Sequence, residues 1–191
     1  MSAKAVFLDK DGTLVEDIPY NIDPDRIRLT EGALEGLRIL QAEGYRLIVV
    51  TNQSGIARGY FEEPALGGVE KRLQELLQPA DIPLTGFYYC PHHPDGTIPE
   101  YALNCSCRKP QPGLLQRAAR EHDIDLVSSW LVGDILNDIE AGKRAGCRAI
   151  LIDNGNETEW ELSPVRQPDF VVKNLYEAAL TITHESLLER N

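Results

Sequence analysis

The sequence predicts an α/β fold on a mainly parallel sheet, from its length, its composition and the order of its patterns. At roughly 150 residues per domain, 191 residues correspond to one domain. Apolar residues make up 42% and charged residues 26% of the chain, as in ordinary globular proteins. Short apolar runs alternate with segments of helical periodicity, which is typical of βα units. We therefore expect a single three-layer, Rossmann-like domain over residues 1–191.

Six short runs of apolar and β-branched residues are the expected strands. In chain order they are Ala5–Leu8, Arg46–Thr51, Gly86–Tyr89, Ser129–Val132, Ala149–Ile152 and the weaker Asp169–Val172. Several of them end in polar residues. In an open parallel sheet the carboxyl ends of the strands form the ligand-binding edge, so these polar residues are candidates for a site.

Helical periodicity fills the intervals between these runs. Thr30 is placed to cap a helix in which Ala33, Leu37 and Leu40 share one face, and Gly44 favours its end. Further helices are expected at about Pro64–Leu77, Gly113–His122, Asn137–Ala145 and Leu175–Leu188. The Gly67-Gly68 pair weakens the first half of its helix, since each glycine costs about 1 kcal/mol relative to alanine.

The intervals between the first strands leave no room for a separate cap domain. Only seventeen residues separate Thr13 from Glu31, and the interval from Asn52 to Gly86 is accounted for by a loop and one helix. By contrast, the stretch 90–107 is long and aperiodic, and a loop of that length needs its own reason to be ordered.

Charge and hydropathy exclude several classes of partner. The net charge is −11, which repels phosphodiester backbones and disfavours nucleic acid. The apolar runs are far shorter than the ~20 residues that span a membrane. Met1–Lys4 leads into the first strand without the apolar core of a secretory signal. We expect a cytoplasmic monomer that acts on a small-molecule substrate.

Two carboxylates, Asp9 and Asp11, directly follow the first predicted strand. Acids at this edge of a sheet favour a cation, although Asp11-Gly12 alone could be simple turn chemistry. A calcium loop of the EF-hand type is excluded, because its sixth and twelfth positions would be Leu14 and Tyr20 rather than glycine and an acid. Since neighbours in an extended segment alternate, we expect Lys10 to point away from the two acids.

Complementary groups stand at three further strand or helix ends. Thr51 and its neighbours end the second strand, Arg108-Lys109 precedes a helix, and Asp134 follows the fourth strand. A nucleophilic carboxylate, a cation site and charged groups that hold phosphoryl oxygens are the requirements for phosphoryl transfer to an acid.

These motifs resemble the haloacid dehalogenase superfamily of aspartate-nucleophile phosphatases, in the order Asp9–Thr13, Thr51, Lys109 and Asp134. The resemblance covers nearly the whole chain. Three longer strings are similar to the histidinol-phosphate phosphatase-like subgroup, which also contains sugar bisphosphate phosphatases: TNQSGIARG at 51–59, YCPHHP at 89–94 and CSCRKP at 105–110. The resemblance implies a magnesium-dependent phosphatase of a sugar bisphosphate, with histidinol phosphate as the alternative substrate.

The resemblance also implies a role for each matching residue. Asp9 would attack phosphorus, and Asp11 would act as general acid and base. Mg²⁺ would be held by the carboxylates of Asp9 and Asp134 and by the carbonyl of Asp11. The remaining residues would bind substrate: Asp17, Ile18, Pro19, Tyr20, Thr51, Asn52, Gln53, Ser54, Arg108 and Lys109. One departure from the family pattern is Ile135, where relatives often carry lysine.

The loop 90–107 carries two close pairs of metal-binding residues, Cys90 with His92 and Cys105 with Cys107. Three thiolates and one imidazole form a closed tetrahedral set that suits structural zinc. Free thiols or a disulfide are the alternatives, and spacing alone would allow His93 in place of His92; the family resemblance favours His92. Cys147 lies outside these pairs and is expected to be a small buried residue.

Two other functional classes are alternatives to the phosphatase. A phosphoacceptor signalling domain also uses an aspartate, a threonine, a lysine and Mg²⁺, but Asp11 would hydrolyse the acyl phosphate instead of preserving it. A zinc-loop interaction module would leave the Asp9–Thr13 cluster without a purpose.

Overall fold

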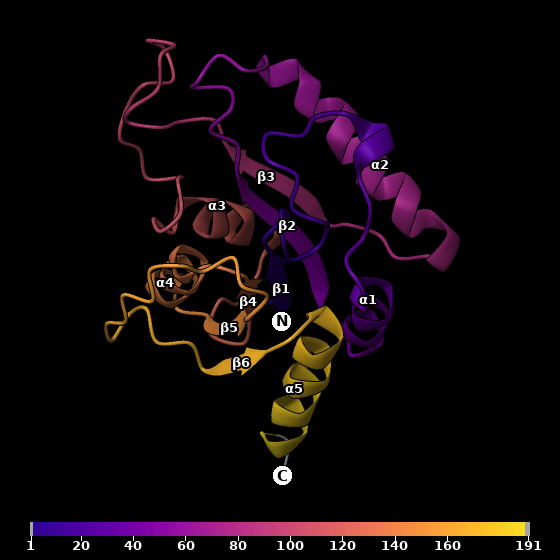
Figure 1. Ribbon diagram of the computed structural model, residues 1–191. Helices are drawn as coiled ribbons and strands as arrows, with labels where there is room; N and C mark the ends of the chain where they lie inside the picture. Colours follow the sequence, from indigo (N-terminus) through magenta and orange to yellow (C-terminus); the bar gives the residue numbers. More distant parts are fainter. Residues whose placement is uncertain (1, 190–191) are drawn as a thin grey trace.

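The computed structural model describes residues 2–189, which contain one six-stranded parallel sheet (Figure 1). The strand order is β3-β2-β1-β4-β5-β6. The strands are β1 (Ala5–Leu8), β2 (Arg46–Asn52), β3 (Gly86–Cys90), β4 (Trp130–Gly133), β5 (Arg148–Ile152) and β6 (Phe170–Val172). The chain therefore winds outward from β1 in one direction and, after β3, outward from β4 in the other.

Helices cover both faces of this sheet. The α-helices are α1 (Ala33–Ala42), α2 (Leu66–Leu77), α3 (Gly113–His122), α4 (Leu136–Ala145) and α5 (Leu175–Leu188). Residues of α1, α2 and α5 pack into one hydrophobic cluster, and those of α3 into another on the opposite face, where α4 also lies (Figure 1). The result is a single three-layer α/β domain.

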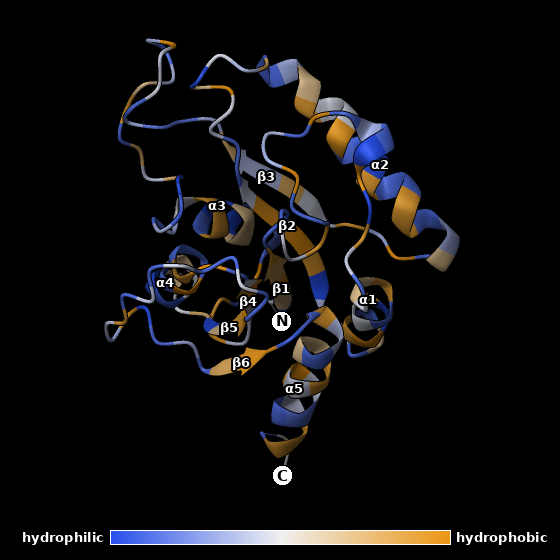
Figure 2. Ribbon diagram, viewed as in Figure 1, coloured by the Kyte–Doolittle hydropathy of each residue, from blue (hydrophilic) through white to orange (hydrophobic). Residues whose placement is uncertain are grey.

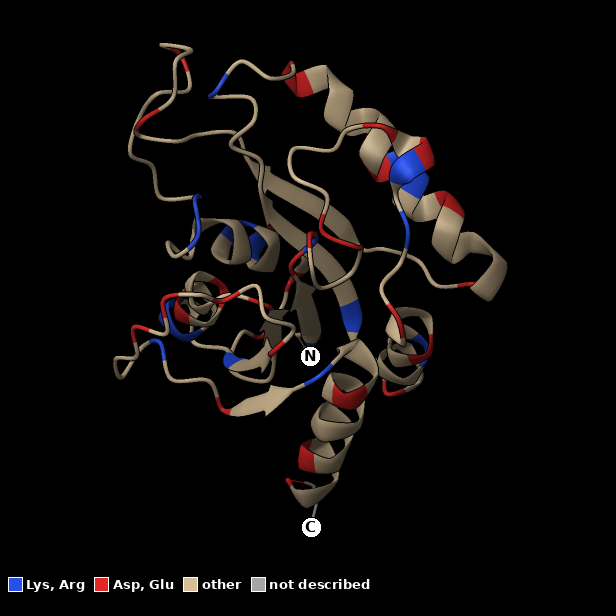
Figure 3. Ribbon diagram, viewed as in Figure 1, with Lys and Arg blue, Asp and Glu red and all other residues tan. Residues whose placement is uncertain are grey.

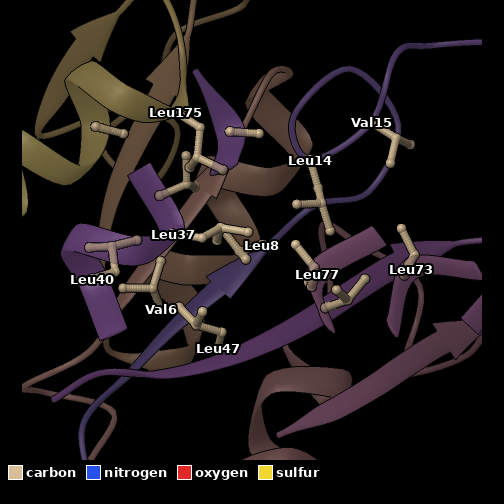
Figure 4. Close-up of a cluster of buried hydrophobic side chains, with 14 of the residues drawn as sticks. Val6, Leu8, Leu14, Val15, Leu37, Leu40, Leu47, Leu73, Leu77 and Leu175 are labelled. Atoms are coloured by element: carbon tan, nitrogen blue, oxygen red, sulfur yellow. The ribbon is translucent and has the colours of Figure 1, made fainter. Parts of the chain in front are cut away.

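The central strands are buried on both faces, which explains their apolar sequence (Figure 2). Along β1 the side chains alternate, so that Val6 and Leu8 face one cluster while Phe7 faces the other. Val6 and Leu8 pack with Leu37 of α1 and Leu175 of α5 (Figure 4). This packing fixes the end of β1 between the two helical layers.

The expected strands and helices are confirmed, and their ends differ from the expected ones by at most two residues. The expectation that Thr30 caps α1 is wrong. Gly32, in a left-handed conformation with φ of +76°, precedes the helix instead, and Thr30 Oγ1 donates to the carbonyl of Thr13 at 2.7 Å. Thr30 therefore ties the start of α1 to the loop that follows β1.

The carboxyl ends of β1, β2 and β4 are adjacent, because β1 pairs with both of the others. The winding direction reverses between β1 and β4, which is where open α/β sheets bind their ligands. Among residues 2–189, no helix combines the length and the apolar character needed to cross a bilayer.

Candidate active site

A cleft of about 270 Å³ lies at the carboxyl ends of these three strands. Acidic positions gather beside the end of β1, with a basic position among them (Figure 3). Most of the lining residues belong to the phosphatase motifs singled out in the sequence, and Asp138 and Asn156 join them: Asp9, Asp11, Asp17, Thr51, Asn52, Lys109, Asp134, Ile135, Asp138 and Asn156. The structure thus brings together residues that are up to 147 positions apart.

Lys109 is the cation at the centre of this cleft, and it is 2% exposed. Its ammonium group lies 2.6 Å from Asp9 Oδ1 and 2.7 Å from Asp138 Oδ1, and it donates to the carbonyl of Val50 at 2.9 Å. An ammonium group has three protons, so these acceptors fix its orientation. Burial opposes the charge, but Asp138 and Asp9 outweigh it and raise the pKa of Lys109.

Asn52 positions the backbone of Lys109. Its side-chain amide donates to the Lys109 carbonyl at 3.1 Å, and its carbonyl oxygen accepts from the Lys109 amide at 3.0 Å. This reciprocal pair joins the end of β2 to the segment before α3. The side chain of Asn52 is therefore engaged with the protein, while its position still lines the cleft.

Three buried carboxylates, those of Asp9, Asp134 and Asp138, place ligand atoms within 4.8 Å of one another. Burial, together with the charges of Asp9 and Asp138, raises the pKa of Asp134 to about 8. The single positive charge of Lys109 balances only one of three acids. A divalent cation would neutralise the rest, so this set of oxygen donors fits Mg²⁺.

Sequence reasoning missed Asp138. It occupies the first turn of α4, and its Oδ2 accepts from the amide of Ile135 at 3.3 Å. Because Oδ1 pairs with Lys109, both oxygens of Asp138 already have partners. The signal was present as a second acid four residues after Asp134, a spacing that places both near the start of one helix.

The expectation for Lys10 is wrong. Lys10 is 2% exposed and forms an ion pair with Asp11 Oδ1. β1 ends at Leu8, and the amides of Leu14 and Val15 donate to the carbonyl of Lys10. Residue 10 thus belongs to a tight turn, in which the alternation of an extended strand does not apply. Burial raises the pKa of Asp11, and the charge of Lys10 opposes this shift.

Gln53 lies beneath the cleft and is 6% exposed. Its amide donates to Thr51 Oγ1 at 2.9 Å and to Asp11 Oδ2 at 3.4 Å. It thereby links two residues of the cleft from below. Ser54 follows it in the turn after β2, where its carbonyl accepts from the amide of Arg58.

The segment 17–20 extends from the cleft to the surface. Asp17 lines the cleft, and Tyr20 is exposed and stacks edge-on with Tyr60 at 4.7 Å between ring centroids. Ile18 and Pro19 connect these two residues and lie outside the lining set.

The loop 90–107 folds its four predicted metal ligands into one cluster. Cys107 Sγ lies 2.9 Å from Cys90 Sγ, 3.4 Å from Cys105 Sγ and 3.3 Å from His92 Nδ1. The distance of 2.9 Å is too long for a disulfide, and the cysteines are free thiols in the described part of the chain. Hydrogen bonding with Cys90 lowers the pKa of Cys107, which favours a thiolate. Three sulfurs and one imidazole fit zinc.

His93 faces away from this cluster and toward arginine. Its Nε2 lies 3.3 Å from Arg58 Nη2. Burial and the charges of Arg108 and Arg58 lower the pKa of His93. Arg108 is joined to the cysteine cluster, because its amide donates to Cys105 Sγ at 3.3 Å. The two arginines therefore form a positively charged group beside the loop that leads to Lys109.

The chain is similar in sequence to known phosphatases. A family model described as HAD-hydrolase-like matches residues 106–178. The chain is 44% identical to the D-glycero-beta-D-manno-heptose-1,7-bisphosphate 7-phosphatase of Pasteurella multocida, over 80% of this chain and 83% of that protein. It is 38% identical to the enzyme of the same name from Salmonella typhi, over 90% and 96%.

A solved structure shares the fold. The D,D-heptose 1,7-bisphosphate phosphatase from B. bronchiseptica, in complex with magnesium and phosphate, superimposes with a TM-score of 0.76 and 29% identity. The match covers 95% of this chain and 99% of that one.

Proposed function

Because the chain belongs to the family of heptose-1,7-bisphosphate 7-phosphatases, which are haloacid dehalogenase-like hydrolases, we propose that it removes the 7-phosphate of D-glycero-D-manno-heptose 1,7-bisphosphate. The observation that carries this proposal is the cleft itself. It sets the buried carboxylate of Asp9 beside the ammonium group of Lys109 and the second acid Asp134. A carboxylate so placed is a nucleophile beside groups that stabilise phosphoryl oxygens.

In the first chemical step a carboxylate oxygen of Asp9 attacks the phosphorus of the 7-phosphate. The new O–P bond forms as the bond from phosphorus to the C7 oxygen breaks. Asp11 donates a proton to the departing sugar alkoxide. The hydroxyl of Thr51 donates a hydrogen bond to a phosphoryl oxygen, and the positive charge of Lys109, held beside Asp9, lowers the energy of the negatively charged transition state.

In the second step water hydrolyses the aspartyl phosphate. Asp11, now a carboxylate, takes a proton from water, whose oxygen attacks phosphorus as the bond to Asp9 breaks. Inorganic phosphate leaves and both acids return to their starting state. Asp9, Asp134 and the carbonyl of Asp11 would hold Mg²⁺, which supplies charge stabilisation to the transferring phosphoryl group.

The cluster of Cys90, His92, Cys105 and Cys107 is proposed to hold one structural zinc ion. A closed set of four protein ligands leaves no position for substrate. Its contribution to activity is therefore indirect. The loop that it folds runs into Arg108 and Lys109, so the metal would fix the position of both cations.

Replacing one zinc ligand tests this role. In the Cys107→Ser variant we expect zinc to fall from one equivalent per chain to below about 0.2. The loss should be local, since structural zinc binding contributes folding energy but a large core already exists here. Hydrogen exchange should rise within residues 90–109, and the KM for substrate should increase more than kcat falls.

The matched control is Cys147→Ser, which removes a buried thiol outside the cluster. Its zinc content should equal that of the wild type. Wild-type protein that is purified without chelators, contains no zinc and has all four thiols free would eliminate the zinc proposal.

The substrate proposal rests on the positive group formed by Arg58 and Arg108 as well as on the relatives. A bisphosphate carries a second phosphate remote from the reacting one. Binding energy from such a remote group can position the phosphate that reacts. Histidinol phosphate, the alternative substrate, lacks this group.

We expect kcat/KM for heptose 1,7-bisphosphate to exceed that for histidinol phosphate at least about a hundredfold, a difference of roughly 2.7 kcal/mol. Arg108→Ala should reduce this ratio about tenfold or more, because it removes a contact that only the larger substrate makes. Arg120→Ala, which removes an exposed charge from α3, should leave the ratio unchanged. A ratio of one or below in the wild type, with histidinol phosphate hydrolysed as well as the bisphosphate or better, would favour histidinol phosphate as the substrate.

Two further expectations complete the proposal. We propose that the protein acts in the cytoplasm, and that it acts as a monomer.

A further inference from the structure

The loop that follows β5 reaches back across the sheet to the cleft. Asn156 Nδ2 donates to Asp134 Oδ2 at 2.6 Å, and Asn154 Nδ2 lies 3.4 Å from the same oxygen. Neither asparagine belongs to the motifs found in the sequence. Both side-chain amides lie against the same carboxylate oxygen, Oδ2 of Asp134. The other oxygen, Oδ1, is therefore available to a cation.

Asn154 is itself held in place. Its Nδ2 donates to the carbonyl of Gly12 at 2.7 Å, and its Oδ1 accepts from the backbone amide of Asn156 at 3.0 Å. The first bond joins the β5 loop to the turn that carries Asp11. The second is a local side-chain turn that orients Asn156.

A second anchor lies just beyond. Glu157 Oε2 accepts from the amide of Leu136, the first residue of α4, at 2.6 Å. A carboxylate at a helix N-terminus accepts a hydrogen bond from a backbone amide that has no partner within the helix. Its negative charge also interacts favourably with the positive end of the helix dipole. Asn156 is thus fixed between two attachment points, on the β1 loop and on α4.

Gly12 packs closely against the contact between Asn156 and Asp134. Gly12 has φ of +81°, and a Cβ atom there would lie 2.0 Å from Asp134 Oδ2 and 2.6 Å from Asn156 Nδ2. No side chain could fit at residue 12 without displacing this carboxylate or this amide. The three residues therefore form one packed contact.

We infer that Asn156, supported by Asn154, is a positioning residue for the cation ligand Asp134, an inference that rests on the cation site of the proposed function. A rigid amide donor fixes the rotamer of the carboxylate and compensates part of its burial. Asn156 thereby sets the affinity of the cation site. Its contact is with Asp134 and not with the reacting phosphate.

The expected consequence is a weaker cation site with intact chemistry. Partners of this kind typically change metal affinity 10–100-fold when they are removed. Asn156→Leu removes the donor and keeps a similar shape, and Asn156→Ala removes both. We expect the Kd for Mn²⁺ to rise about 10–100-fold in each.

The measurement is a titration of zinc-loaded protein with Mn²⁺ in the absence of substrate. The concentration of free Mn²⁺ is read at each step from its electron paramagnetic resonance signal. In parallel, the Mg²⁺ concentration for half-maximal activity should rise by a similar factor, while kcat at saturating Mg²⁺ stays within about threefold of the wild type. Loss of a residue needed only for folding would lower Tm and the active fraction. It would not raise the Mg²⁺ requirement of the remaining active enzyme.

Asn137→Ala is the matched control, because Asn137 lies in the first turn of α4 and its Oδ1 accepts from Arg166. It should bind Mn²⁺ as the wild type does. An unchanged Kd in folded Asn156→Ala or Asn156→Leu overturns the inference, and so does a fall in kcat alone. A wild-type protein that binds no Mn²⁺ overturns the cation site of the proposed function, and with it this inference.

Discussion

Asp9→Asn is expected to lower kcat at least about a thousandfold while the fold remains intact. The amide keeps the shape of the side chain but cannot form the acyl phosphate, and loss of a nucleophile removes most of the rate enhancement. Asp9 lies next to Lys109 at 2.6 Å, so the substitution also removes one ion-pair partner from a buried ammonium group. The measurement is steady-state turnover of a sugar bisphosphate at saturating Mg²⁺.

Asp81→Asn is the control for this change. Asp81 is exposed and has φ of +54°, a conformation that asparagine tolerates well. It should retain full activity. The nucleophile assignment fails if an Asp9→Asn sample, shown by mass spectrometry to be free of deamidation, keeps more than about a tenth of the wild-type kcat.

Asp11→Asn is expected to show a defect that depends on the leaving group. For the poor alkoxide leaving group of a sugar, loss of general acid catalysis should lower kcat/KM about 10²–10⁴-fold. For p-nitrophenyl phosphate, whose leaving group needs no proton, the defect in kcat/KM should be at least about tenfold smaller. We choose kcat/KM because it reports the steps up to formation of the aspartyl phosphate.

The second step gives an independent readout on the same variant. Since Asp11 is also proposed to activate water, hydrolysis of the aspartyl phosphate should be slow in this variant, and the phosphorylated enzyme should accumulate with p-nitrophenyl phosphate. An equal defect in kcat/KM for both esters would contradict the role of Asp11 in leaving-group departure.

The sheet could be predicted from the sequence because its central strands are buried on both faces. Such strands are apolar runs of four to seven residues, as in Ala5–Leu8 and Arg46–Asn52, and polar residues mark where they end. The carboxyl ends of adjacent parallel strands must then meet. Asp9, Thr51 and Asp134 could be placed in one cleft for this reason.

The errors lie where the local rule that was applied no longer holds. The alternation of an extended strand does not apply to Lys10, because this residue lies in a turn that brings its side chain onto Asp11. Thr30 has the chemistry of a helix cap, yet a tertiary partner, the carbonyl of Thr13, takes its hydroxyl. In both cases the position of the side chain is set by a contact that forms only when the loop after β1 is folded.

The residues that were missed carry weaker signals. Asp138 could have been found from its spacing to Asp134 on a predicted helix. Asn154 and Asn156 lie in an aperiodic loop after β5, and asparagine and glycine there are equally typical of an ordinary turn. Only the fold shows that this loop returns to the cleft.

The most direct test of the proposed function is to follow the hydrolysis of D-glycero-D-manno-heptose 1,7-bisphosphate by ³¹P nuclear magnetic resonance, in the presence of Mg²⁺. We expect the signal of the 7-phosphate to be converted to that of inorganic phosphate while the signal of the 1-phosphate persists. Asp9→Asn should leave both signals unchanged over the same time. Loss of the 1-phosphate first would refute the proposed 7-phosphatase activity, and so would the absence of any phosphate release by the wild-type protein.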